Sequence, residues 1–239
     1  TAGAWLEEVA NGCLVETPGQ TVSQWVAENV WLAPPMCPPA LAGPYDLGRT
    51  PYVARFMDLA RDPDVRKVVV MKSSRTGFTE AFLNVLRWMP SHAPGPVLYA
   101  INSQDKARDV ARKRVIPSLR DVASDQMTGA ADDVTVGRVQ LVNMDIIITG
   151  SGSAGPFMET WYQVIGLDEL EEHDDAHEET TVDRSEGRLV GVENGKLYVW
   201  SKPQLAGGPI HREFLRGTQE KWWVPCPRCG EMQELVWEF

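Results

Sequence analysis

Residues 68–82, VVVMKSSRTGFTEAF, combine an apolar run, a turn of small residues and the beginning of a helical pattern. A strand that ends in such a turn presents backbone N–H groups, together with the N-terminus of the next helix, to an anion such as a phosphate. Gly77 allows the backbone to approach a phosphate closely, and the Thr79 hydroxyl is suited to Mg²⁺. The segment therefore predicts a loop for nucleotide phosphates over residues 72–79.

This loop departs from the standard phosphate-binding pattern, G-x-x-x-x-G-K-[ST]. Lys72 stands where the first glycine is expected, and Phe78 stands where the phosphate-binding lysine is expected. Lys72 and Arg75 both lie in the turn, so the positive charge has moved upstream, and Arg75 can also bind a phosphate through two hydrogen bonds at once. An ordinary strand–turn–helix with a surface lysine and arginine is the alternative that these residues leave open.

A pair of carboxylates, Asp168 and Glu169, follows the apolar run of QVIGLDEL at residues 163–170. In open α/β sheets, ligands bind at the edge formed by the carboxyl ends of the strands. Phosphoryl transfer needs one carboxylate for the Mg²⁺ water shell, which Asp168 fits. It needs another to orient or deprotonate the attacking water, which Glu169 fits. The alternative is a strand that ends in a solvated acidic loop.

Ser201 ends a third strand-like segment, KLYVWSKP, at residues 196–203. A small polar residue at the tip of a strand beside the phosphate loop could sense whether the γ-phosphate is present and pass that on to mobile parts. A strand-terminal serine before a Lys-Pro turn explains the same residues without a function.

Strands that alternate with helices must position these residues. The pattern predicts strands at 65–72, 96–102 and 161–169, two short strands within 136–150, and a strand within 193–203 after a hairpin-type Asn-Gly turn. It predicts helices near 21–31, 50–62, 78–89, 103–123 and 208–219, with Thr50 and Ser103 as N-caps of the second and fourth. Such alternation indicates an α/β fold with a mostly parallel sheet covered on both faces.

The composition is that of an ordinary globular protein, with 43% apolar and 23% charged residues among 239. The net charge of −10 is concentrated in DELEEHDDAHEE at residues 168–179, so it does not argue against a nucleic-acid partner. No apolar run approaches the ~20 residues that span a bilayer, and because residues 1–13, TAGAWLEEVANGC, lack a basic region followed by an apolar block, we expect no secretory signal. Four cysteines, two of them in a C-x-x-C, favour a reducing compartment.

The order KSSRTGFT, VIGLDEL, VWSKP and VPCPRCGEMQELVWEF resembles the large subunit of tailed-phage terminases of the lambda type, over about residues 45–239. The resemblance implies a P-loop NTPase core of the RecA-like (ASCE) class. It implies that Asp168 and Thr79 bind Mg²⁺, that Glu169 and Arg75 are catalytic, and that Ser201 couples hydrolysis to motion, although Lys202 departs from the usual threonine. The implied ATP-binding residues are Lys72, Ser73, Ser74, Arg75, Thr76, Gly77, Phe78, Thr79, Arg49 and Tyr52.

The resemblance also implies a function, namely ATP hydrolysis with Mg²⁺ that translocates duplex DNA into a procapsid in the host cell cytoplasm. The implied partners are double-stranded DNA, the terminase small subunit, the portal protein and identical subunits in a ring, with no membrane. We expect an N-terminal helix and Pro-rich arm at 1–44, the ATPase core at 45–220, and a C-x-x-C segment at 221–239 leading toward a nuclease that is not in this chain. The alternatives are a helicase-like remodelling ATPase and a non-hydrolysing nucleotide-binding assembly domain.

Several weaker signals remain. Cys226 and Cys229 have the spacing of a zinc knuckle, but a closed site needs four ligands, so a free C-x-x-C turn is the competing interpretation. Cys13, Cys37 and His211 are the remaining candidate ligands. His173 and His177 lie four apart among carboxylates, a spacing that fits either a metal-binding face or a solvated acidic helix or loop. Residues 105–114, DKARDVARKR, fit either sequence-independent contacts to DNA phosphates or a solvated helix face. Arg184 and Arg188 are candidates for an arginine that acts on a neighbouring subunit.

Overall fold

The computed structural model describes residues 19–34, 37–127, 134–135, 137–158, 160–173 and 179–234. Within them, a seven-stranded sheet has the order β3-β9-β8-β4-β7-β6-β5. The first five strands in this order are parallel, and the pairs β7–β6 and β6–β5 are antiparallel. The predicted, mostly parallel sheet is confirmed. Its strands are β3 (Lys67–Met71), β4 (Val97–Ile101), β5 (Val134–Thr135), β6 (Arg138–Gln140), β7 (Asp145–Gly150), β8 (Val164–Asp168) and β9 (Lys196–Ser201).

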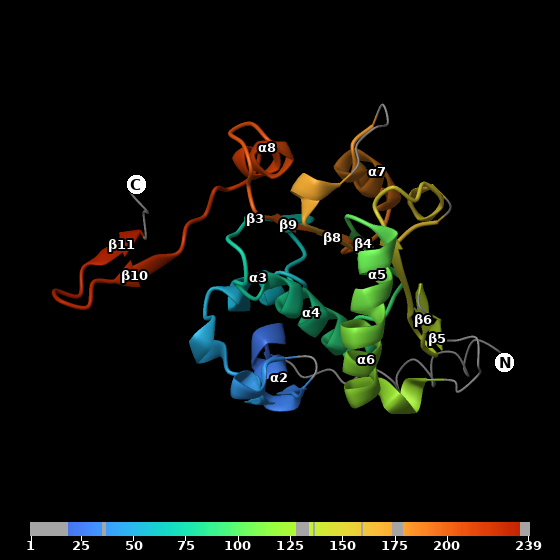
Figure 1. The fold of residues 1–239 in the computed structure, drawn as a ribbon, viewed down its shortest axis with the longest axis horizontal. Coiled ribbons are helices and arrows are strands. Elements are labelled where there is room, and N and C mark those ends of the chain that lie inside the picture. The colour runs from blue at the N-terminus through green and yellow to red at the C-terminus, as the bar shows by residue number, and fades with distance from the viewer. Residues whose placement is uncertain are drawn as a thin grey trace.

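Helices cover both faces of this sheet (Figure 1). One face carries α2 (Val22–Asn29), α3 (Val53–Asp58), α4 (Phe78–His92), α5 (Gln104–Val110) and α6 (Ile116–Ala123), and the other carries α7 (Thr181–Arg188) and α8 (Pro209–Leu215). Side chains alternate between two apolar cores along β4 and β9, as the pleat requires. Tyr99, Tyr198 and Trp200 enter the first core, and Leu98, Leu197 and Val199 enter the second. Shorter 3-10 turns cover Pro39–Leu41, Leu47–Arg49, Ser124–Gln126, Gly155–Phe157 and Leu170–Glu172.

All five predicted helices form, but two differ in detail. The predicted cap at Thr50 is wrong: α3 begins at Val53, its N-cap is Tyr52, and residues 50–52 form a preceding turn in which the Val53 N–H donates to the Thr50 carbonyl at 3.1 Å. The predicted helix at 103–123 is interrupted by a π-helical turn at Ala111–Val115 between α5 and α6. Its predicted cap is confirmed, because the Ser103 hydroxyl accepts from the Lys106 N–H at 3.3 Å.

The Asn-Gly turn before β9 is not part of a hairpin. Asn194 has a φ of 53°, in the left-handed region that such turns use. However, the segment before it is the helix α7, and β9 is parallel to both of its neighbours. The turn therefore connects a helix to a parallel strand. Asn194 and Gly195 suit this connection as well as they suit a hairpin.

Two short antiparallel pairs lie outside the main sheet. In the N-terminal arm, β1 (Trp31–Leu32) pairs with β2 (Gly43–Pro44). At the other end, β10 (Trp223–Pro225) and β11 (Met232–Glu234) form a hairpin that projects from the body of the molecule (Figure 1). The division at residues 44 and 220 stays a prediction. Within the described residues, no helix is long and apolar enough to span a membrane.

Candidate active site

The three segments singled out in the sequence meet at one edge of the sheet, at the carboxyl ends of β3, β9 and β8. Strand β9 lies between the other two, with Ser201 opposite Met71 and Trp200 opposite Asp168. The ladder continues past the strand ends, because the Lys72 N–H donates to the Ser201 carbonyl at 3.0 Å and the Glu169 N–H donates to the Trp200 carbonyl at 2.9 Å. The backbone itself therefore sets the spacing between the loop and the acidic pair.

The loop at residues 72–79 has the backbone expected of an anion-binding turn. Arg75 and Gly77 both have positive φ, at 61° and 86°, and Gly77 is the N-cap of the fifteen-residue helix α4. A Cβ on Gly77 would meet nothing closer than the Thr50 Cγ2 atom at 3.7 Å, so the left-handed backbone, not space, requires glycine there. The Thr76 hydroxyl donates to the Ser73 carbonyl at 3.0 Å and tightens the turn. Ser73, Ser74 and Arg75 are exposed.

Lys72 points to the acidic pair. Its Nζ atom lies 2.5 Å from the Glu169 Oε1 atom, its side chain is 6% exposed, and that of Glu169 is 35% exposed. Glu169 itself has φ 56° and ψ 55°, a left-handed conformation that is costly for a residue with a side chain. Such strain concentrates at functional sites. The displaced lysine and the proposed catalytic carboxylate are therefore neighbours, although 97 residues separate them in the chain.

Thr79 and Asp168 form the second half of the site. The Thr79 hydroxyl donates to Asp168 Oδ2 at 2.9 Å, and the Tyr99 hydroxyl donates to the same oxygen, also at 2.9 Å. Among the described residues, the buried Asp168 Oδ1 atom has no hydrogen-bond partner. Burial raises the pKa of Asp168, while the hydrogen bonds from Tyr99 and Thr79 oppose that rise. An unsatisfied carboxylate oxygen beside a threonine hydroxyl fits the oxygen ligands and bound waters that Mg²⁺ prefers.

Ser201 is buried, and its hydroxyl forms hydrogen bonds with Glu169 and with the loop that follows Glu169. Its hydroxyl accepts from the Glu171 N–H at 3.1 Å and lies 3.5 Å from Glu169 Oε2, which also accepts from the Lys202 N–H at 3.4 Å. A shallow hollow of about 270 Å³ opens beside these groups and is lined by Met71, Lys72, Ser73, Lys202 and Pro203. Ser201 thus contacts both Glu169 and the following loop, and its coupling role stays a prediction.

Phe78, at the position of the missing lysine, turns to an aromatic cluster. Its ring centroid lies 5.9 Å from that of Tyr52 and 5.4 Å from that of Phe56. Tyr52 in turn contacts Trp222, at 6.1 Å between centroids. Arg49 forms an exposed ion pair with Asp46 at 3.3 Å. Tyr52 is therefore adjacent to the phosphate loop through Phe78, whereas no described contact ties Arg49 to that loop.

The two arginines suggested for a neighbouring subunit have contacts within this chain. The Arg184 guanidinium lies over the Phe157 ring, 5.0 Å from its centroid, and donates to the Thr181 hydroxyl at 3.2 Å. Arg188 donates to the Met158 carbonyl at 3.0 Å. The contacts with Phe157 and Met158 join α7 to the turn at residues 155–158, and a role for either arginine at another subunit's site stays a prediction.

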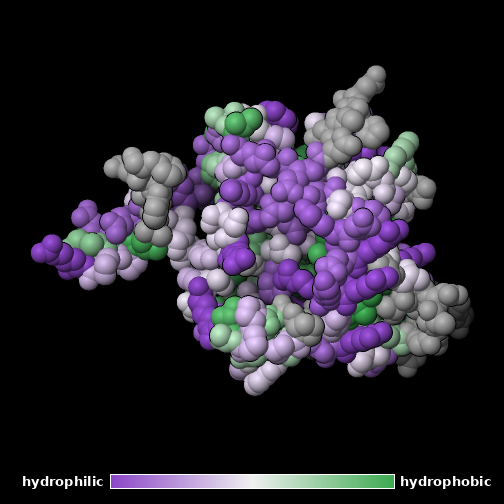
Figure 2. Space-filling view, in the orientation of Figure 1, coloured by the Kyte–Doolittle hydropathy of each residue, from purple (hydrophilic) through white to green (hydrophobic). Residues whose placement is uncertain are grey.

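Most of the basic side chains in residues 105–114, which lie on α5 and the π-helical turn, form ion pairs with nearby carboxylates. Its ion pairs are Lys106–Glu172 at 3.2 Å, Arg108–Asp105 at 3.3 Å, Lys113–Asp109 at 2.7 Å and Arg114–Glu80 at 2.5 Å. Among the described residues, Arg112 has no ion pair. Figure 2 shows hydrophilic residues over α5. The contacts match the solvated helix face more closely than a surface of free cations.

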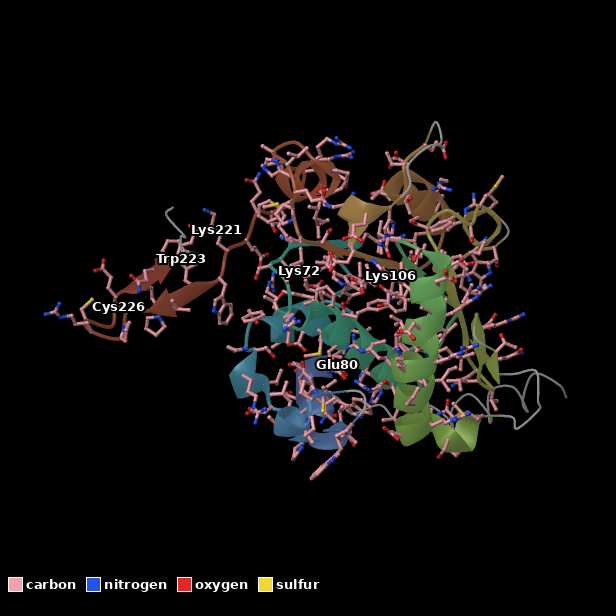
Figure 3. All side chains as sticks on the ribbon, in the orientation of Figure 1. Lys72, Glu80, Lys106, Lys221, Trp223 and Cys226 are labelled. Atoms are coloured by element: carbon pink, nitrogen blue, oxygen red, sulfur yellow. The ribbon has the colours of Figure 1, made fainter. Side chains whose placement is uncertain are left out.

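The described residues contain no group of three or more His, Cys, Asp and Glu side chains that could hold a metal ion. Cys226 and Cys229 are free thiols on the projecting hairpin, where Figure 3 places Cys226 far from Lys72. His211 instead accepts from the Gly207 N–H at 2.8 Å, and the His173 ring lies against the Asp168 carbonyl at 2.8 Å. Cys13 and His177 lie outside the described residues. Cys37 is also a free thiol, and among the described residues no third His, Cys, Asp or Glu side chain joins Cys226 and Cys229 in a group that could hold zinc.

Three contributors to the site were missed in the sequence. Tyr99 lies inside β4 and contacts Asp168, and the Trp200 Nε1 atom donates to the Thr79 hydroxyl at 3.3 Å. Glu80, next to Thr79, forms ion pairs with the buried Arg87 and with Arg114. A polar atom on an otherwise apolar strand was the available signal for Tyr99. An acidic residue in the first turn of α4 was the signal for Glu80.

The family model described as "Phage terminase large subunit gpA, ATPase domain" matches residues 39–239. The terminase large subunit of Escherichia phage lambda is 26% identical over 235 residues, covering 90% of this chain and 35% of that protein. That of Enterobacteria phage P21 is 25% identical over 198 residues, covering 77% of this chain and 30% of that protein. The chain thus spans about a third of the length of these curated relatives.

Solved structures share the fold. The large terminase of bacteriophage HK97 aligns with a TM-score of 0.61 at 13% identity, covering 82% of this chain and 42% of that one. The large terminase ATPase domain of Thermus phage P74-26 aligns with a TM-score of 0.53 at 14% identity, covering 81% of this chain and 78% of that one. The sheet and its helices are those of a terminase ATPase domain. With the family model matched over residues 39–239, the chain belongs to the family of phage terminase large subunit gpA ATPase domains.

Proposed function

We propose that this chain hydrolyses ATP with Mg²⁺ and that the hydrolysis drives duplex DNA into a viral procapsid. Membership of the terminase ATPase family supports the proposal. The observation that carries it is the meeting of Thr79 with Asp168 and of Lys72 with Glu169 at one sheet edge, with hydrogen-bond distances of 2.9 and 2.5 Å. These are the four groups that phosphoryl transfer to water needs: a metal-binding hydroxyl, a carboxylate for the metal shell, a cation and a base.

Each residue has a defined task in this proposal. The backbone N–H groups of residues 73–79 and the N-terminus of α4 hold the phosphates. Thr79 and Asp168 would hold Mg²⁺, which would offset the negative charge of the phosphates. Lys72 and Arg75 replace the missing lysine at the phosphates. Glu169 orients the attacking water and accepts its proton, a function that requires Lys72 to release the carboxylate it binds at 2.5 Å.

The wider assembly is proposed on family grounds. Double-stranded DNA, a terminase small subunit, a portal protein and further copies of this chain in a ring are the partners, and the host cell cytoplasm is the location. Zinc at Cys226 and Cys229 would need two more ligands from beyond the described residues. Metal analysis of the purified protein tests that site separately.

A nucleotide-binding domain that no longer hydrolyses ATP is the second candidate. The phenylalanine at position 78 favours it, because the standard loop lysine is absent. The low exposure of the Lys72 side chain, 6%, and its direct contact with Glu169 favour hydrolysis, because they support a cation supplied to the phosphates from another position in the loop. Phosphate release from ATP, measured with Mg²⁺ and with EDTA, separates the two. Hydrolysis predicts release that EDTA abolishes, and a binding domain predicts none in either condition.

Replacing Lys72 with glutamine is expected to lower kcat/KM for ATP about 10²–10³-fold, because an aligned charged donor to the phosphates is lost. The matched control is Lys113→Gln, which removes one positive charge from an exposed pair on the helical surface and is expected to leave the rate unchanged. Steady-state phosphate release measures both. Equal rates for Lys72→Gln and the unchanged protein would show that Lys72 does not replace the missing lysine.

A further inference from the structure

Tyr99 is a fully buried tyrosine whose hydroxyl reaches the proposed site at the carboxyl ends of β3, β9 and β8. It lies in the middle of β4, opposite Gly166 of β8, and its hydroxyl donates to Asp168 Oδ2 at 2.9 Å. A buried phenolic hydroxyl usually has a hydrogen-bond partner, and the partner of this one is the carboxylate that the proposed function assigns to the metal shell. The bond crosses between adjacent parallel strands, so the sheet fixes its geometry.

The two oxygens of Asp168 have different surroundings. Oδ2 accepts from both Thr79 and Tyr99, whereas Oδ1, buried as well, has no partner among the described residues. Two donors on one oxygen hold the carboxylate in a single rotation, because turning it would break both bonds. The other oxygen is thereby kept as the free acceptor. A carboxylate held in this way is pre-organised to take a metal ion or its bound water.

The aromatic layer beneath the site holds Tyr99 in turn. The Tyr99 ring packs on Phe82 and Trp200, at 5.1 and 6.2 Å between centroids, and Trp200 donates to Thr79 at 3.3 Å. Gly166 leaves the room that Phe82 occupies, since a Cβ there would lie 2.3 Å from the Phe82 Cζ atom. Two residues of this aromatic layer therefore hold the site: the Tyr99 hydroxyl holds Asp168, and the Trp200 indole N–H holds Thr79.

We propose that Tyr99 is a positioning residue for the metal site: its hydroxyl fixes the Asp168 carboxylate so that Oδ1 stays available to Mg²⁺ or its water shell. This inference rests on the proposed function, because it assigns Mg²⁺ to Asp168. Tyr99 contacts neither nucleotide nor water in this role, and it acts only through Asp168. Removing the Tyr99 hydroxyl should thus raise the Mg²⁺ concentration that the protein requires. It should leave the affinity for nucleotide unchanged when Mg²⁺ is saturating.

The matched pair of variants is Tyr99→Phe and Tyr198→Phe. Tyr198 is also fully buried, packs on Phe82 at 5.7 Å, and its hydroxyl has no partner among the described residues. Each variant loses one buried hydroxyl from the same aromatic layer, but only Tyr99→Phe loses a bond to Asp168. Thermal unfolding of both variants reports whether either is disturbed as a whole.

The measurement is a Mg²⁺ titration with two readouts: binding of a fluorescent ATP analogue and rate of phosphate release. For Tyr99→Phe we expect the Mg²⁺ midpoint to rise about tenfold in both, within the range for a residue that orients a metal ligand. Saturating Mg²⁺ should restore most of the rate, which a general loss of structure would not permit. Tyr198→Phe should keep the original midpoint.

The outcomes separate this inference from the function on which it rests. If the unchanged protein neither binds nor hydrolyses ATP in a Mg²⁺-dependent way, the proposed function fails and the inference fails with it. If the unchanged protein does both and Tyr99→Phe has the same midpoint as Tyr198→Phe, the inference alone is overturned. A loss in Tyr99→Phe that saturating Mg²⁺ does not restore also overturns it, because the tyrosine then serves the fold and not the metal.

Discussion

Replacing Glu169 with glutamine is expected to lower ATP turnover by about 10²–10⁴-fold, the contribution of a positioned general base. Glutamine keeps the size of the side chain but does not accept the proton of the attacking water. It also loses the charge that binds Lys72 at 2.5 Å. Steady-state phosphate release at saturating Mg²⁺ and ATP measures the effect.

Nucleotide binding is the control for this variant. The phosphate loop and the contact of Thr79 with Asp168 do not involve the Glu169 side chain, so Glu169→Gln should bind ATP at least as tightly as the unchanged protein. Freeing Lys72 from its carboxylate partner favours tighter binding. Equal turnover in the two proteins would remove Glu169 from the catalytic role.

Replacing Glu80 with glutamine is expected to lower the free energy of unfolding by about 3–5 kcal/mol, the cost of breaking a buried ion pair from one side. Glu80 binds Arg87 and Arg114, each at 2.5 Å, and its side chain is 14% exposed while that of Arg87 is 2% exposed. The variant leaves two arginines without their carboxylate. Urea unfolding measures the loss, with Glu193→Gln, an exposed acid, as the matched control. A loss no larger than that of the control would contradict the account of this cluster.

The same cluster predicts a pH dependence with a defined sign. Burial by itself disfavours the charge on Glu80, but Arg87 and Arg114 outweigh it and hold the Glu80 pKa below its usual value. A depressed carboxylate pKa contributes stability that is present above the unfolded-state pKa, about 4.3. That contribution disappears as the pH falls through the lower folded-state pKa. The stability gap between the unchanged protein and Glu80→Gln should therefore narrow as the pH falls below about 4.

The sequence predicts the edge of the sheet well, because local patterns determine it. Apolar runs that end in polar residues locate β3, β8 and β9, and the parallel arrangement of their ends follows from the alternation with helices. The sequence alone therefore predicts that Lys72, Thr79, Asp168 and Glu169 lie at one edge of the sheet, although it does not predict which side chains touch. Gly77 is predictable for the same local reason, since its left-handed backbone precedes a helix.

The sequence does not predict contacts that depend on how the strands are paired in register, or on residues that are far apart in the chain. Tyr99 meets Asp168 only because β4 pairs with β8 in one particular register. An apolar strand with one hydroxyl gives no sign of which carboxylate that hydroxyl faces. The pairing of Lys72 with Glu169 likewise depends on β9 lying between their strands.

Sequence rules for turns and helix caps also gave wrong predictions where the same residues suit two different local structures. Asn194 and Gly195 suit a turn between antiparallel strands and equally a turn from a helix into a parallel strand, and the second is observed. Thr50 is a good capping residue before a proline, but the turn at residues 50–52 moves the helix start to Val53. Neither outcome can be read from the residues of the turn alone.

A crystal structure of this chain with a non-hydrolysable ATP analogue and Mg²⁺ tests the central claim most directly. We predict the β- and γ-phosphates over residues 72–79, with Lys72 Nζ moved from Glu169 to a phosphate oxygen and the metal beside Thr79 and Asp168. A nucleotide bound elsewhere on the molecule would contradict the claim. So would phosphates in the loop with Lys72 still paired to Glu169, because the lysine would then not be the relocated cation.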